Sequence, residues 1–318
     1  MALKQVMEVI DLLDSAQVNG ASVGDLLKAR GWTDWTVEHI EGARGSTDFV
    51  TISLPGSAGK RAGGQAPTLA ILGRLGSIGA RPQVIGMVSD ADGAIVALAT
   101  ALKLIGMKQQ GDVLLGDVVI ATHISPSAPP PERPNAAGMR MMGSPVNGRE
   151  IAMREARIEA DAVLSIDATK ANRVLNQRGF AISPTVKEGY ILRVSDDLLD
   201  IMQQVTGRMP LVFPLATQDL VPNWELRHIN SIMLPTARTR APVVGVATTA
   251  ETVVHGVATG ANQPLDLEMT VRFCIEVAKA FGQGTCHFYD PTEFEKLLSL
   301  YGPMTHLQTA GMTQRSNA

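Results

Sequence analysis

The chain has 318 residues, of which 45% are hydrophobic and 4% aromatic, and its formal net charge is −3. This composition supplies enough apolar material for a large core, and the slightly acidic balance argues against nucleic acid or an anionic membrane surface as a partner. No apolar run reaches the ~18 residues that would span a bilayer. The two cysteines, Cys274 and Cys286, are expected to be reduced thiols in a cytoplasmic protein.

The first part of the chain is expected to be helical. Residues 2–14 and 22–30 carry apolar side chains at helical spacing. Charged residues interrupt the apolar run of the first segment, which favours an amphipathic helix over a signal peptide. The first strand is expected at residues 48–55, so that residues 1–47 would form a helical lead-in.

From residue 48 onward, short apolar runs alternate with helical segments. This alternation predicts an α/β fold with a mostly parallel sheet covered by helices on both faces, within one domain of residues 1–318. Residues 287–318 are expected to form a last helix and a polar tail. The expected strands are 48–55, 67–73, 82–88, 112–122, 161–167, 189–194, 210–216 and 241–248, and the other expected helices are 92–106, 147–160, 195–207 and 264–282.

A proline-rich segment, residues 126–145, interrupts this alternation. Long irregular loops in compact domains are often functional. The segment directly follows the apolar strand that ends near His123 and Ser125. We therefore expect the strand end and the loop to lie at a functional edge of the sheet.

Four residues with metal-binding side chains follow predicted strands: Asp90, His123, Asp167 and His255. In open α/β sheets, ligands bind beyond the carboxyl ends of the strands, and imidazole and carboxylate groups are the usual ligands of divalent transition metals. The sequence therefore predicts a metal site built from four separate segments. Taken singly, each residue has an ordinary alternative, because Asp90 suits a helix cap, Asp167 a turn, and either histidine a surface or core position.

At these residues the chain resembles the co-catalytic zinc aminopeptidases and their deacetylase relatives. The resemblance implies a phosphorylase/hydrolase-like fold, and within the group the chain is identified as a member of the domain-of-unknown-function family 1177. The segments that carry it are "SDADGAIVALATALKLIG", with Asp90 in the place of the metal-bridging Asp, "EADAVLSIDATKANR", with Asp167 as the next Asp ligand, and "APVVGVATTAETVVHG", with His255 as the final His ligand.

Two motifs of the resembled family are lost. Its His-x-Asp motif falls on Gly73 and Leu75, and its Glu-Glu pair, a general base and a ligand, falls on Ser125 and Pro126. His123 lies two residues before that pair, on the same face of a continuing strand as Ser125. His123 is therefore expected to replace the missing ligand or base.

The resemblance implies a metal-dependent hydrolase of a small amide or peptide-like substrate, acting as a homo-oligomer with a rearranged metal site. Zinc is the expected metal, with manganese or cobalt as alternatives. The loss of both motifs supports a second hypothesis, a peptidase-fold protein without metal or peptidase activity that binds a small molecule or serves in assembly or regulation. A third hypothesis makes Ser125 or Lys170 a nucleophile with His123 as its base.

Overall fold

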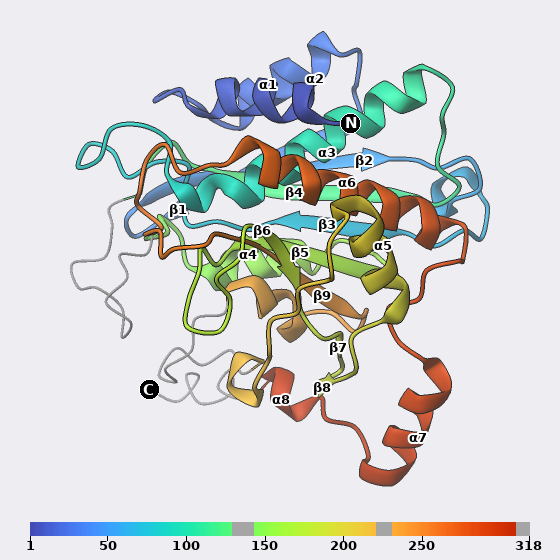
Figure 1. The fold of residues 1–318 in the computed structure, drawn as a ribbon. Helices are drawn as coiled ribbons and strands as arrows, with labels where there is room; N and C mark the ends of the chain where they lie inside the picture. The colour runs from blue at the N-terminus through green and yellow to red at the C-terminus, as the bar shows by residue number, and fades with distance from the viewer. Residues whose placement is uncertain (129–142, 221–230, 310–318) are drawn as a thin grey trace.

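The computed structural model describes residues 1–128, 143–220 and 231–309. One sheet lies between two layers of helices (Figure 1), which confirms the predicted α/β architecture. No helix in the described ranges is long and apolar enough to cross a membrane. The helices are α1 (Leu3–Leu13), α2 (Gly20–Ala29), α3 (Asp92–Gln109), α4 (Gly148–Glu155), α5 (Asp196–Thr206), α6 (Pro264–Gly282), α7 (Pro291–Tyr301) and α8 (His306–Thr309), with short 3-10 helices η1 (Lys60–Ala62), η2 (Ser89–Ala91), η3 (Thr217–Asp219) and η4 (Ser231–Ala237).

The sheet has a parallel centre and antiparallel margins. Its strand order is β1-β2-β4-β3-β5-β9-β7-β8, and β6 also pairs with β9. The four central strands β4, β3, β5 and β9 are parallel, whereas β1, β2, β6 and β7 pair with their neighbours in antiparallel fashion. The strands are β1 (Trp35–Gly42), β2 (Gly45–Leu54), β3 (Leu69–Gly73), β4 (Val118–Ile124), β5 (Ala162–Ala168), β6 (Gly179–Ile182), β7 (Val186–Lys187), β8 (Tyr190–Ile191) and β9 (Val243–Thr249).

The central strands are buried on both faces, as continuous apolar runs predict. Alternate residues of β3 enter different cores: Leu69 and Ile71 pack in the core shared with α3 and α6, whereas Ala70 and Leu72 pack in a smaller core below the sheet. Helix α3 is buried on nearly all sides because it lies between the sheet and the helices α1 and α6. The sheet is thereby held from both sides, with its strand ends fixed at one edge.

Helix termini follow the expected local chemistry. The Ser195 hydroxyl of α5 accepts a hydrogen bond from the Leu198 amide, and Gly207 ends the helix with a left-handed φ of 65°. A side chain is strained in that conformation, so glycine is the favoured residue there. Ser195 and Gly207 thus mark the two ends of α5, which confirms the helix expected at residues 195–207.

Several predicted elements differ from the structure. Residues 1–47 contain β1 and the start of β2 as well as α1 and α2, so a purely helical lead-in is wrong. Residues 82–88 and 210–216 form only isolated bridges, at Met87, Val88 and Val212. Strand β3 is already paired on both edges by β4 and β5, so no place beside it remains for residues 82–88. Within the predicted C-terminal segment, α7 and α8 are helical, and residues 310–318 lie outside the described residues.

Close packing of α3 against the strand ends depends on Gly93. A Cβ atom there would lie 2.1 Å from the Arg74 carbonyl oxygen and 2.8 Å from that of Ile166. We predict that Gly93→Ala lowers the free energy of unfolding by about 3 kcal/mol, because backbone must move to admit the methyl group. Denaturant unfolding measures the change.

Gly106, in the same helix, is the matched control. A Cβ atom there meets nothing within 4 Å. Gly106→Ala is expected to raise the free energy of unfolding by about 0.5–1 kcal/mol, through helix propensity and a less flexible unfolded chain. Equal effects of the two substitutions would contradict this account of α3 packing.

Candidate functional site

Three side chains lie in a row across the carboxyl end of the parallel sheet. In the strand register, Gly73 of β3 is level with Thr122 of β4 and with Ile166 of β5. One residue further along, Arg74 follows β3, His123 lies in β4 and Asp167 lies in β5. The Arg74 amide donates to the Ile166 carbonyl over 2.8 Å. Residues at one level of neighbouring parallel strands point to the same face. Arg74 thus lies between His123 and Asp167.

The row lines a cavity of about 1540 Å³. Three of the four predicted metal-binding residues, Asp90, His123 and Asp167, line it. His255 is exposed and is not one of the lining residues. The cavity opens beyond the carboxyl ends of the strands, where α/β sheets bind ligands. Its apolar wall includes Leu175, Phe213, Ile232, Leu234 and Val254.

His123 is a buried, neutral histidine. Its ring Nδ1 lies 3.2 Å from the Thr47 hydroxyl oxygen on β2, and the residue is 3% exposed. Burial, together with the neighbouring Arg74 charge, lowers the pKa of His123 to about 3, although the Leu75 backbone opposes the change. His123 therefore carries no positive charge at neutral pH.

Asp167 is a buried carboxyl group at the end of β5. Burial raises its pKa to about 6, against the opposing effect of hydrogen bonds from Ser231 and Ala168 and of the Arg74 charge. The Ser231 hydroxyl donates to Oδ2, and the Ala168 amide donates to Oδ1 over 2.7 Å. A carboxyl group with this pKa is able to exchange protons near neutral pH.

The Arg74 guanidinium group forms a buried ion pair with Glu155 of α4. Nη1 donates to both carboxylate oxygens, and each side chain is 5% exposed. Burial raises the pKa of Glu155, and the Arg74 charge opposes that rise. The Nε atom of Arg74 is buried and has no hydrogen-bond partner in the described residues. A cation thus stands at the centre of the row, held by α4.

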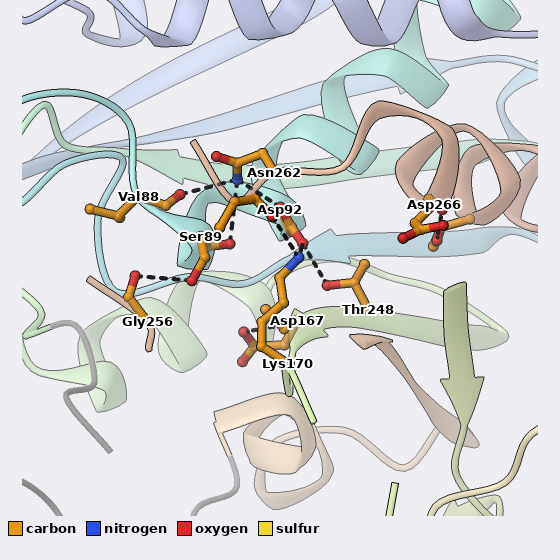
Figure 2. A network of polar contacts seen from close by, with 12 residues as sticks. Val88, Ser89, Asp92, Asp167, Lys170, Thr248, Gly256, Asn262 and Asp266 are labelled. Atoms are coloured by element: carbon orange, nitrogen blue, oxygen red, sulfur yellow. Dashed lines mark hydrogen bonds and ion pairs between the residues drawn. The ribbon is translucent and has the colours of Figure 1, made fainter. Parts of the chain in front are cut away.

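A second buried ion pair joins α3 to the loop after β5 (Figure 2). Lys170 Nζ lies 2.5 Å from Asp92 Oδ2, and the two side chains are 5% and 0% exposed. The Thr248 hydroxyl of β9 donates to the same carboxylate oxygen over 2.7 Å, and Asn262 Nδ2 donates to Oδ1 over 2.7 Å. Asp92 is therefore saturated by protein donors. Figure 2 shows these donors arriving from separate segments around the carboxylate.

The backbone that carries Lys170 is strained. Lys170 and Ala171 have φ angles of 38° and 67°, in the left-handed region. Such conformations cost of order 1–3 kcal/mol each in non-glycine residues and persist where surrounding contacts hold them. Here the Thr248 carbonyl accepts from both the Thr169 and Lys170 amides, over 2.8 and 3.3 Å, and the Lys170 carbonyl accepts from Val254 over 3.1 Å. The loop is thus fixed with its lysine directed at Asp92.

The sequence of the chain matches that of a protein family. Residues 38–311 match the family DUF1177, described as a protein of unknown function. The chain belongs to the DUF1177 family. No curated protein matches it in sequence.

Solved structures share the fold of this DUF1177 chain. The bottromycin maturation enzyme BotP is similar with a TM-score of 0.56 and 16% identity, over 89% of this chain and 70% of BotP. A glutaminyl cyclase from an Acidobacteriales bacterium is similar with a TM-score of 0.52 and 13% identity, over 89% and 94% of the two chains. Leucyl aminopeptidase from Leishmania major has a TM-score of 0.52 and 13% identity, over 85% and 61%. At these identities the likeness establishes a peptidase-like fold.

The predicted four-residue metal cluster is not assembled in this DUF1177 chain. Among residues 1–128, 143–220 and 231–309, no group of three or more His, Cys, Asp or Glu side chains could hold a metal ion. His255 is exposed and is not one of the lining residues, although its neighbours Val254 and Gly256 are, and the buried His123 ring contacts Thr47. Arg74 stands between His123 and Asp167, and a cation there disfavours a metal ion beside it. The described residues therefore do not provide three such side chains around one ion.

Ser125 also lies outside the cavity lining. It is 0% exposed, and its hydroxyl donates to the Ser127 carbonyl over 2.9 Å. The Ser125 carbonyl accepts hydrogen bonds from the Ser77 hydroxyl and the Ile78 amide. These contacts give Ser125 a structural part in the turn that follows β4. The remainder of the proline-rich segment includes residues 129–142, which lie outside the described residues.

Sequence analysis named Lys170 as a candidate nucleophile but did not predict its ion pair with Asp92, and it did not include Arg74 among the candidate site residues. Arg74 lies between Gly73 and Leu75, where the resembled family carries His-x-Asp. Its place directly after a buried strand was the available signal. An arginine buried there requires an acidic partner, because arginines are rarely buried unpaired. Glu155, that partner, lies on a helix whose packing the sequence does not reveal.

The raised pKa of Asp167 predicts a pH-dependent effect of Asp167→Asn. The folded state holds the Asp167 proton up to about pH 6, whereas an unfolded aspartate loses it near its ordinary pKa of 3.8. Ionised Asp167 therefore reduces stability progressively as pH rises from 4 to 6. Relative to wild type, Asp167→Asn is expected to gain up to about 2–3 kcal/mol in free energy of unfolding by pH 7.

Denaturant unfolding between pH 4 and 8 measures this difference. Asp11→Asn, at an exposed position of α1, controls for the removal of one formal charge. A gain that is the same at pH 4 and pH 7 would contradict a raised pKa for Asp167.

Proposed function

We propose that this DUF1177 protein binds a small peptide-like or other amide-bearing molecule in its cavity, without the two-metal centre of the zinc aminopeptidases. Arg74 and Lys170 take over the neutralising role that metal ions have in such sites. The structural neighbours support the ligand class, because their names describe aminopeptidases, a glutaminyl cyclase and a bottromycin maturation enzyme. A shared fold does not by itself transfer their chemistry.

The position of Arg74 is the observation that carries this proposal. A two-metal centre needs carboxylate and imidazole ligands facing a shared ion. In the row across β4, β3 and β5, the central place belongs to a guanidinium group paired with Glu155. The second carboxylate near the strand ends, Asp92, is paired with Lys170. Glu155 and Asp92 are therefore each balanced by a cationic side chain of the protein.

The cavity retains the properties of a binding site. Its apolar wall suits side chains or an acyl group, and Asp90, Asp167 and Arg74 offer polar contacts to an amide. Fixed charges on buried side chains orient a polar ligand with little reorganisation. The two ion pairs thus hold Arg74 and Lys170, the polar floor of the cavity, in one arrangement before a ligand binds.

Metal-dependent hydrolysis of a small amide is the second candidate function. Asp90, His123 and Asp167 line one cavity, and one structural neighbour is BotP in complex with Mn. Asp90 also lies close to the chain after β9, since a Cβ atom at Gly256 would be 2.8 Å from both Asp90 carboxylate oxygens. This candidate requires a metal held by fewer than three of the described His, Cys, Asp and Glu side chains, or by residues outside the described ranges.

Metal content and ligand binding distinguish the two candidates. We predict less than roughly a tenth of a metal ion per chain after purification without chelator and incubation with zinc, manganese or cobalt. Inductively coupled plasma mass spectrometry gives the ratio. Peptides and N-acyl amino acids that bind the cavity are expected to raise the melting temperature by the same amount with and without EDTA.

Arg74→Met supplies the control for site-specific binding. Loss of the guanidinium group leaves Glu155 buried without its partner, so the double variant Arg74→Met/Glu155→Gln is used to keep the fold. In this double variant, the affinity for the ligand, measured from the ligand-induced rise in melting temperature, is expected to fall at least tenfold. One metal ion per chain, together with metal-dependent amide cleavage, would establish the second candidate instead.

A further inference from the structure

The cavity contains a hydroxyl group that is hydrogen-bonded to a buried carboxyl group. Ser231 begins η4, lines the cavity and donates its hydroxyl hydrogen to Asp167 Oδ2. Asp167 is 8% exposed, and its other oxygen is held by the Ala168 amide. The carboxyl group is thus fixed in direct contact with a partly exposed serine. A nucleophile and a positioned base in this relation are the elements of acyl transfer.

Arg74 adds the third element. It lies beside Asp167 in the strand row and lines the same cavity. Its charge acts on Asp167, so the guanidinium group is close enough to influence charge at that point. Negative charge develops on the carbonyl oxygen during acyl transfer, and a fixed cation stabilises it most effectively in a water-poor site. The Arg74–Glu155 pair keeps that cation in place.

We propose that Ser231 is a nucleophile, with Asp167 as its base, for the hydrolysis of small amides or esters in this cavity. This inference deepens the proposed function and rests on its ligand class. The nearby lining residues Phe213, Ile232 and Leu234 are apolar, so the acyl group is an apolar one. The reaction requires the substrate and water alone.

The bond changes balance in two steps. In the first, Ser231 Oγ attacks the carbonyl carbon, its proton passes to Asp167, and that proton leaves with the amine or alcohol as the carbon–nitrogen or carbon–oxygen bond breaks. In the second, Asp167 takes a proton from water, the resulting hydroxide attacks the acyl carbon, and Ser231 Oγ recovers the proton as it leaves. The products are a carboxylic acid and the free amine or alcohol. A carboxylate base serves both steps because it returns to its starting state.

A second serine that lines the cavity provides the comparison. Ser144 also lines the cavity and is partly exposed, but within the described residues it has no hydrogen bond to a carboxylate. Ser144→Ala is therefore the matched control for Ser231→Ala. Both substitutions remove one hydroxyl group from the same cavity. Only Ser231 has the Asp167 partner that the proposal requires.

A fluorophosphonate probe tests the nucleophile directly. Its phosphorus atom forms a bond to the activated serine oxygen as fluoride leaves, and mass spectrometry of peptides locates the adduct. We expect an adduct on Ser231 that disappears in Ser231→Ala and persists in Ser144→Ala. Asp167→Asn is expected to slow labelling about 100-fold. That variant is predicted to be at least as stable as wild type at pH 7, so slower labelling does not reflect unfolding.

Several results would overturn the inference. These are labelling that is absent, labelling that occurs at another serine, and labelling that proceeds at the wild-type rate in Asp167→Asn. If the wild-type chain binds the peptide panel without metal but resists the probe, the proposed ligand class stands and the nucleophile is wrong. If the chain holds one metal ion per molecule, yet the probe labels Ser231 and labels it more slowly in Asp167→Asn, the metal-free proposal fails and the nucleophile stands.

Discussion

Balance of buried charge at the carboxyl end of the sheet determines the arrangement of this site. Asp92 is fully buried, and Glu155 nearly so, and an unpaired carboxylate in either place would cost several kcal/mol. Lys170 and Arg74 supply the counter-charges. Because the four partners come from α3, α4 and the ends of β3 and β5, the ion pairs tie both helical layers to the strand ends. Arg74 and Lys170, the cations of these pairs, also line the cavity.

The two pairs differ in what they leave available. Asp92 receives donors from Lys170, Thr248 and Asn262, so its oxygens have little capacity for a ligand. Arg74 contacts Glu155 through Nη1 alone, while its Nε has no partner in the described residues. Buried donors without partners are costly, and such groups occur where a ligand, water or function accounts for them. The arginine pair is accordingly the chemically open side of the floor, and the lysine pair is its structural side.

Sequence reasoning succeeded where burial alone determines structure. Strands β3, β4, β5 and β9 are continuous apolar runs, and α3, α5 and α6 have strong helical patterns or clear caps, so each was predicted. Strand β1 was missed because "WTVEHIEG" is a half-exposed edge strand with charged residues, and β6 because four residues carry little pattern. Residues 82–88 have the apolar pattern of a buried strand, but β3 is already paired with β4 on one edge and with β5 on the other. The sequence does not reveal this tertiary constraint.

The strand-end rule placed His123 and Asp167 at one cavity, and Asp90 also lines it although the strand expected before it, residues 82–88, does not form. The rule did not identify which residues control the chemistry. That depends on pairings between distant segments: Asp92 with Lys170, and Arg74 with Glu155. Neither pair has a spacing that a sequence pattern would reveal. Cations attached to the chain neutralise the carboxylates without exchange, whereas metal ions bind reversibly and activate water. In the function proposed above, the cavity and its fixed charges remain, and the chemistry falls to side chains such as Asp167 and Ser231.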